Sequence, residues 1–142
     1  MLKKTVLLLL IALLSSSCAP RIAMYSPAVY ENAVTLKVET RVLVLQAGES
    51  YQKHRAEAKE LMFKVEKAYE YARGLPDNEL TAKQWEIMKD PEKNLLGGFI
   101  KMWQGKDSLE ATLVTEKAGQ IDKAYDQIIW LESKKINRSD LK

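Results

Sequence analysis

Apolar and small residues recur every three or four positions over a long stretch of this chain. This spacing matches the turn of an α-helix. The residues that carry it are Val29, Ala33, Leu36, Thr40, Leu43, Ala47, Tyr51, His54, Ala58, Leu61, Val65, Ala68 and Ala72. Ser26-Pro27 is a typical helix start, and Arg73-Gly74-Leu75-Pro76 is a typical helix end. The sequence therefore predicts one very long helix over residues 27–73.

Two features argue against an unbroken helix. Gly48 lies in its middle and costs about 1 kcal/mol relative to Ala, so a break near residues 48–50 would give a helical pair instead. Apolar residues also alternate with polar ones from Val34 to Val44, which is the period of a β-strand. A strand needs a partner, and no second segment alternates convincingly. We therefore favour helix over strand here.

The rest of the chain predicts three shorter helices. The first opens at the capping-box pair Thr81 and Gln84, and Asp90-Pro91 ends it and starts the second. The second helix stops before Gly105, and the last spans about 109–136. The expected fold class is all-α. We expect an elongated helical bundle or hairpin with one very long N-terminal helix and shorter helices packed back along it, as a single domain over 27–142.

The first residues have the layout of a secretory signal peptide. Basic Lys3-Lys4 precedes an apolar run over 6–14, and the small residues Ser15-Ser16-Ser17 follow. The run of nine apolar residues is about 14 Å long as a helix. That is too short for a permanent transmembrane helix, which needs about 20 apolar residues. We expect residues 1–17 to be removed as a signal peptide.

The end of this segment, Leu14-Ser15-Ser16-Ser17-Cys18, resembles the lipobox of bacterial lipoproteins. That class prefers Leu three residues before the cysteine, where this chain has Ser15. The resemblance implies that Cys18 receives a diacylglyceryl thioether and becomes the acylated first residue after cleavage. It implies nothing about the fold beyond the signal. Ala19 follows the cysteine, and in two-membrane bacteria the class tends to reach the outer membrane when Asp is absent there.

The alternative is an ordinary secretory signal cut near Ser17 or Ala19, with Cys18 incidental. The lipoprotein reading is favoured because a lone free thiol is a liability in an oxidising compartment, whereas a lipidated thiol is consumed. Several acyl chains would also anchor the protein stably to a membrane. Residues 18–26 then form a lipidated N-terminus and a short tether, so the helical domain lies close to the membrane.

Charge and composition exclude several function classes. The 22 basic and 19 acidic residues become 20 and 19 once Lys3 and Lys4 leave with the signal, so a nucleic-acid binder is not expected. His54 has only Glu57 as a neighbour at helical spacing, which is too little for a metal site. No catalytic motif or phosphate loop is present in the sequence. We predict a non-enzymatic protein without a cofactor.

A few residues stand out as candidates for an interaction surface or a pocket. Two consecutive glycines inside a helical pattern need a compensating reason. We expect a close helix crossing, where the missing Cβ lets backbones approach, or a local kink; the alternative is an apolar groove or hinge that receives a partner. Each tryptophan is either a core anchor or, if exposed, a binding hot spot or membrane contact. The candidates are Trp85, Gly97, Gly98, Phe99, Trp103 and Trp130.

The last predicted helix ends with basic residues. Lys134 and Lys135 complement the dipole of that helix, and Arg138 follows in a polar tail. The alternative role for these three cations is contact with anionic lipid.

These observations predict a small envelope lipoprotein that is held at a membrane by its acyl chains and presents a helical surface to another envelope protein. Assembly, exclusion or immunity, and structural roles all fit this description. The alternative is a periplasmic module that binds a small apolar ligand between helices, in a pocket lined by Met62, Phe63, Trp85, Phe99 and Trp103. A third reading, an envelope hydrolase, would need a cleft with clustered ionisable groups.

Overall fold

The computed structural model describes the backbone of residues 23–139 and the side chains up to Lys135. This part of the chain holds five α-helices and no strand, which confirms the all-α prediction for the described residues. The helices are α2 (Pro27–Val44), α3 (Tyr51–Arg73), α4 (Glu79–Lys89), α5 (Leu96–Lys106) and α6 (Ala111–Ser139). None of them is both long and apolar enough to cross a membrane. Cys18 and the predicted signal peptide lie outside the described residues.

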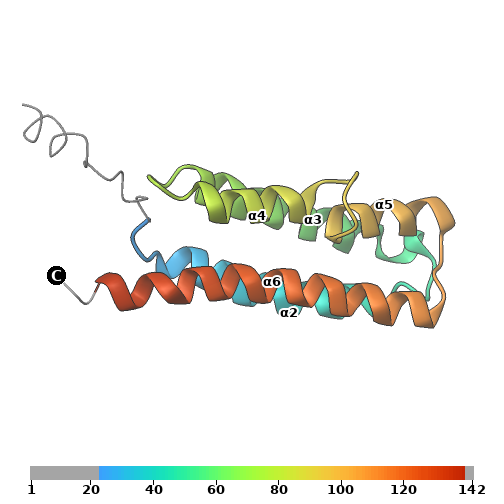
Figure 1. The fold of residues 1–142 in the computed structure, drawn as a ribbon. Coiled ribbons are helices and arrows are strands. Elements are labelled where there is room, and N and C mark those ends of the chain that lie inside the picture. The colour runs from blue at the N-terminus through green and yellow to red at the C-terminus, as the bar shows by residue number, and fades with distance from the viewer. Residues whose placement is uncertain (1–22, 140–142) are drawn as a thin grey trace, which may run out of the picture.

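The helices form an elongated bundle with alternating directions (Figure 1). α2 and α6 lie side by side, and α3 lies beside α4 and α5. α4 and α5 run in the same direction and together make one side of the bundle, so the topology is up-down-up-down with a broken third helix. We call the end that holds Ala23 and Ser139 the terminal end, and the end that holds the connections 45–50 and 107–110 the turn end.

The prediction of one very long N-terminal helix is wrong. α2 ends at Val44 and α3 begins at Tyr51, so the chain reverses near Gly48. In a continuous helix the Tyr51 N–H would donate to the Ala47 carbonyl oxygen. Here the Tyr51 N–H donates instead to the Asp107 carbonyl oxygen (2.6 Å), and the Ala47 carbonyl oxygen accepts from the Leu109 N–H (2.8 Å). The α5–α6 connection thus forms hydrogen bonds with both groups, the Tyr51 N–H and the Ala47 carbonyl, and these bonds stabilise the break between α2 and α3.

The strand-like alternation in residues 34–44 belongs to the helix α2. Two series of residues spaced by four interleave along it. Leu36, Thr40 and Val44 are buried, whereas Val34, Val38 and Val42 are exposed on the opposite side. A period of two therefore arises here from two apolar stripes of one helix, not from the two faces of a strand.

α4 begins at Glu79, two residues before the predicted capping residue Thr81. Asn78 is the residue that precedes the helix, and Thr81 lies inside its first turn. The Thr81 hydroxyl donates to Glu132 of α6 (2.7 Å) instead of capping its own helix. A tertiary hydrogen bond has replaced the predicted capping box.

The two consecutive glycines open α5 where the chain folds back on itself. A Cβ on Gly97 would overlap the Lys89 carbonyl oxygen and lie 2.7 Å from the carbonyl carbon of Asp90. A Cβ on Gly98 would overlap the Lys93 carbonyl oxygen. The glycines therefore permit a close backbone approach, as the packing interpretation expected, although the approaching backbone is the α4–α5 connection and not a crossing helix.

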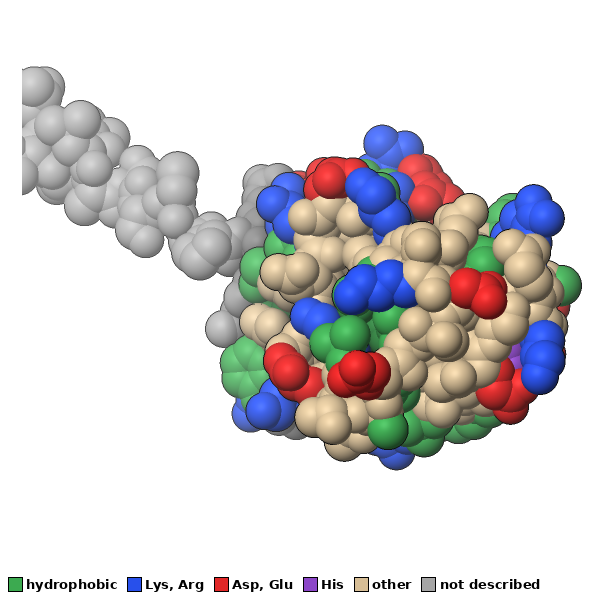
Figure 2. Space-filling model, turned by 90° about the vertical axis from the view of Figure 1, so that its right-hand side faces the viewer, with side chains coloured by type: hydrophobic (Ala, Val, Ile, Leu, Met, Phe, Trp, Pro, Cys, Tyr) green, Lys and Arg blue, Asp and Glu red, His purple; other side chains and the backbone are tan. Residues whose placement is uncertain are grey.

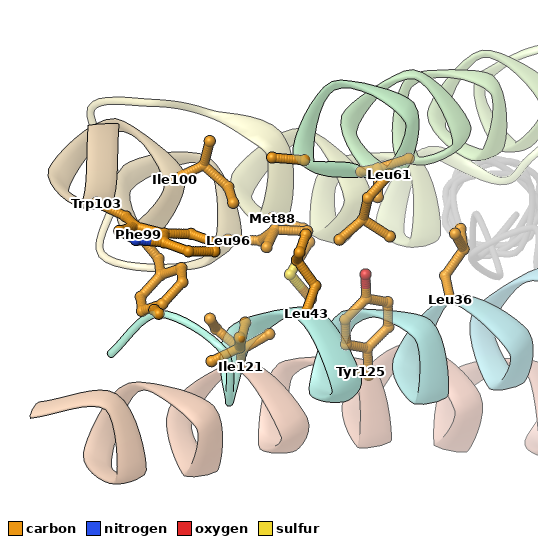
Figure 3. Packing of buried hydrophobic residues seen from close by; sticks show 14 of the residues in the cluster. Leu36, Leu43, Leu61, Met88, Leu96, Phe99, Ile100, Trp103, Ile121 and Tyr125 are labelled. Carbon is orange, nitrogen blue, oxygen red and sulfur yellow. The ribbon is translucent and has the colours of Figure 1, made fainter. Parts of the chain in front are cut away.

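The apolar core runs along the bundle between two layers, one formed by α2 and α6 and the other by α3, α4 and α5 (Figure 3). Its largest fully buried side chains include Trp85, Trp103, Tyr125, Phe99 and Met88. Trp103 packs edge-on against Tyr51 with the ring centres 5.5 Å apart, and Trp85 packs similarly against Tyr125 at 5.8 Å. Ala23, the first of the described residues, is buried and donates its N–H to the Asp77 carbonyl oxygen (3.1 Å).

Candidate functional site

α2 carries an apolar stripe on its outward face. Val38, Val42 and Leu45 are each 58% exposed, and Val34 is 38% exposed. These four residues are spaced by four, four and three, so they line one side of the helix directly opposite its buried side. A helix that is apolar on both sides is normally covered on both sides. This stripe, Val34, Val38, Val42 and Leu45, is the candidate site.

A groove between α2 and α3 borders the stripe. Near the turn end the groove forms a hollow of about 370 Å³ whose apolar wall consists of Val38, Val42, Leu43 and Leu61. Towards the terminal end it continues as a second hollow of about 450 Å³ between Thr35 and Tyr71. Glu39 and Lys64 line both hollows.

An ion pair crosses the groove at its middle. Lys64 of α3 donates to both carboxylate oxygens of Glu39 of α2, at 3.0 and 3.2 Å, and lies 3.3 Å from Glu60. The hydrogen bonds to Glu39 and Glu60 raise the pKa of the Lys64 amine above its ordinary value. Lys64 is therefore charged and held by two carboxylates, and it fixes α2 against α3.

The hollow at the turn end is acidic. Three carboxylates, Glu39, Glu57 and Glu60, line it together with the single amine of Lys64. Glu57 also contacts the His54 ring, with its carboxylate 3.0 Å from Nδ1. The arrangement of an apolar wall with excess negative charge can bind an apolar segment that carries basic residues.

The other flank of α2 is closed by ion pairs with α6. Arg41 donates through Nε to Asp122 (2.9 Å), and Lys37 pairs with Asp126. The hydrogen bond and the charge of Asp122 raise the pKa of Arg41. These pairs hold α6 against one side of α2. The α2–α3 groove lies along the other side of the stripe, which faces solvent.

The residues predicted from sequence as candidates separate into two groups. Trp85, Phe99 and Trp103 are buried in the core, Gly97 is buried and Gly98 half-buried under the α4–α5 connection. Trp130 is 57% exposed on α6. The structure therefore brings none of these six residues into the α2–α3 groove. The alternating pattern of residues 34–44 was the sequence signal for the stripe, but it was considered only as a mark of a strand.

The five residues suggested for an apolar ligand pocket do not line one cavity. Phe63 is 65% exposed on α3, whereas Trp85, Phe99 and Trp103 are almost completely buried among core side chains. Met62 lines a surface hollow with charged residues of α4, including Glu86 and Lys89.

His54 lies beside the core at the turn end. Its ring centre is 5.6 Å from that of Trp103, and its Nε2 atom is 3.6 Å from a Glu49 carboxylate oxygen. Glu49 also pairs with Lys53 at 3.3 Å, which with His54 lowers the pKa of the Glu49 carboxyl. Within residues 23–139, no three metal-binding side chains are grouped as a metal site would require.

A buried polar cluster ties α4 to α6 near the terminal end. Lys135 Nζ donates to Glu132 (2.5 Å), Asn78 (2.5 Å) and Thr81 (3.2 Å). The Asn78 amide in turn donates to the Ala72 carbonyl oxygen at the end of α3 (2.8 Å). The alternative role of Lys135, contact with anionic lipid, is wrong, because its amine is buried and paired with Glu132 inside the bundle. The cluster has the form of a structural clamp, since every donor of the Lys135 amine is used.

No family model, no curated protein and no solved structure matches this chain.

Proposed function

We propose that this protein is a small lipoprotein of the bacterial envelope that binds another envelope protein through the α2–α3 groove. Cys18 carries the acyl chains, and the helical bundle stands next to the membrane. The function is non-enzymatic: confinement to a membrane raises the effective concentration of a partner for a modest interface. Ala19 after the cysteine favours the outer membrane in a two-membrane host.

The observation that supports the interaction most strongly is the exposed stripe Val34, Val38, Val42 and Leu45. It runs along most of α2 beside a groove with an apolar wall. A partner helix can lay its apolar face in such a groove. The acidic hollow at the turn end requires that this partner segment carry Lys or Arg beside its apolar residues.

The binding surface can be tested by photo-cross-linking in the native envelope. A photoreactive residue replaces Gln46, which lines the hollow without forming its apolar wall. We expect an adduct with an amphipathic, basic segment of a different envelope protein, and we expect Val38→Glu to abolish it. Phe63→Glu is the matched control because Phe63 is an exposed apolar residue outside the hollow.

Two results would contradict the proposed site. One is an adduct that persists unchanged in the Val38→Glu variant. The other is an adduct formed only with a second copy of this chain, which would make the groove a self-association surface.

A further inference from the structure

Trp130 is the exposed tryptophan of the described residues. Its side chain is 57% exposed on the outward face of α6, whereas Trp85 and Trp103 are both completely buried. An exposed indole has a large apolar body and a polar N–H, and this combination favours the interface between water and lipid headgroups.

Two lysines share the outward face of α6 with Trp130. Lys134 lies one helical turn away, with its Nζ atom 5.6 Å from the centre of the indole ring. Lys123 is exposed on the same outward face. The nearby acids Asp122 and Asp126 are paired with Arg41 and Lys37 of α2. Trp130 and the two lysines therefore form a face that suits a surface of anionic phospholipid.

This face lies towards the terminal end of the bundle, which also holds Ala23. Ala23 is fixed to the Asp77 carbonyl oxygen at the terminal end, where α6 also ends (Figure 1). Cys18 is five residues before Ala23, so an extended chain of this length spans at most about 18 Å. A lipid on Cys18 would hold the terminal end within that distance of the membrane.

Other exposed apolar residues occur at the terminal end. Met24 is 75% exposed just before α2, and Leu80 is 61% exposed in the first turn of α4. Met24 and Leu80 are therefore apolar side chains that a membrane at the terminal end would meet. At the turn end, positive and negative side chains are interspersed with apolar ones (Figure 2).

We propose that Trp130 and Lys134 form a second membrane contact, in which the indole enters the phospholipid headgroup region and the lysine binds anionic lipid. This proposal rests on the lipid anchor at Cys18 and goes beyond it by orienting the bundle. With the terminal end at the membrane, the acidic hollow near Gln46 is held away from the lipid, where a partner can reach it.

Tryptophan quenching by brominated lipid tests the contact directly. The full chain is recovered from the envelope, and its mass shows whether Cys18 is acylated. Acylated protein is reconstituted into vesicles of zwitterionic and anionic phospholipid with brominated acyl chains. Protein with a free thiol is coupled through Cys18 to a maleimide-bearing phospholipid in the same vesicles. Both routes place the same chain next to the same lipid, so the test does not depend on acylation in the cell.

We expect brominated lipid to quench Trp130 strongly, and the quenching to be lost in Trp130→Phe and reduced in Lys134→Gln. Trp85 and Trp103 remain as buried internal references in each variant. Wild-type emission quenched no more than that of Trp130→Phe would overturn the second contact. A photoreactive residue at the exposed neighbour Gln127 that links to a protein in the native envelope, and not to lipid, would also overturn it.

Discussion

The hydroxyl groups of Thr40 on α2 and Tyr125 on α6 lie 2.8 Å apart in the bundle interior and form a hydrogen bond. Thr40 is 1% exposed and Tyr125 is completely buried. Each hydroxyl therefore satisfies the hydrogen bond of the other and offsets the free-energy cost of burying it. The pair also fixes the register of α2 against α6, which sets the direction in which the exposed stripe of α2 faces.

Removing one partner of this pair should destabilise the bundle more than removing both. Thr40→Val leaves the Tyr125 hydroxyl buried without a partner, at a cost of about 1–3 kcal/mol in the free energy of unfolding. Tyr125→Phe should have a similar effect. The double variant should recover part of this loss, which urea denaturation of all four proteins measures as a coupling energy. Purely additive losses would show that the hydrogen bond is not formed.

Stability should fall at high pH because of Tyr125. Burial, the largest influence, raises the pKa of the Tyr125 phenol far above its ordinary value. The unfolded chain then loses its proton at about pH 10, while the folded chain keeps it. Since the folded state binds more protons above that pH, stability declines as the pH rises further. Denaturation curves between neutral pH and pH 11 should show a steeper decline in the wild type than in the Thr40→Val/Tyr125→Phe double variant. Equal slopes would contradict the assignment.

The buried amine of Lys135 should be more costly to remove alone than together with its carboxylate partner. Lys135→Met leaves the Glu132 carboxylate, which is completely buried, without its cation. We expect a loss of about 3–5 kcal/mol in the free energy of unfolding. Adding Glu132→Leu should restore much of it, because the unpaired charge is then gone.

Lys134→Met is the control for that experiment. Lys134 is the exposed neighbour of Lys135 and should tolerate the same change with little effect on stability. If Lys135→Met and Lys134→Met unfold at the same urea concentration, the clamp is not present in solution.

Gly97 should not tolerate a methyl group. Gly97→Ala forces its Cβ against the backbone of Lys89 and Asp90, which cannot move away as a flexible side chain could. We expect a loss of several kcal/mol, measured by thermal unfolding. Gly119→Ala is the matched change in an exposed helical position with open space around it, and it should stabilise α6 by about 0.5–1 kcal/mol. Similar behaviour of the two variants would contradict the close approach.

Helix periodicity predicted most of the secondary structure but not the reversal between α2 and α3. The spacing of apolar residues continues through Ala47 and Tyr51 because both are buried in the same core. What breaks the helix is a pair of hydrogen bonds to Asp107 and Leu109, more than fifty residues away along the chain. Local sequence could indicate only that Gly48 weakens a continuous helix.

The polar clamp and the exposed stripe show why the sites were harder to predict. Glu132 and Lys135 continue the inward spacing of Ile121, Tyr125 and Ile128, but charged residues at such positions suggest solvent. The outward valines of α2 show the reverse case: apolar residues suggest burial in a core, but these side chains are exposed. The core-anchor alternative holds for Trp85 and Trp103 and not for Trp130. The inward spacing of Ile121, Tyr125 and Ile128 places residue 130 on the opposite side of the helix, which was the sequence signal for its exposure.

The proposal as a whole depends on the chemical state of Cys18. The most direct measurement is mass spectrometry of the N-terminal peptide of the protein isolated from its native envelope, combined with fatty-acid labelling of the wild type and Cys18→Ser. The proposal predicts a wild-type chain that begins at an acylated Cys18, sediments with membranes and incorporates label. The Cys18→Ser variant should show none of these three properties. A wild-type protein found in the soluble fraction with a free Cys18 thiol would contradict it.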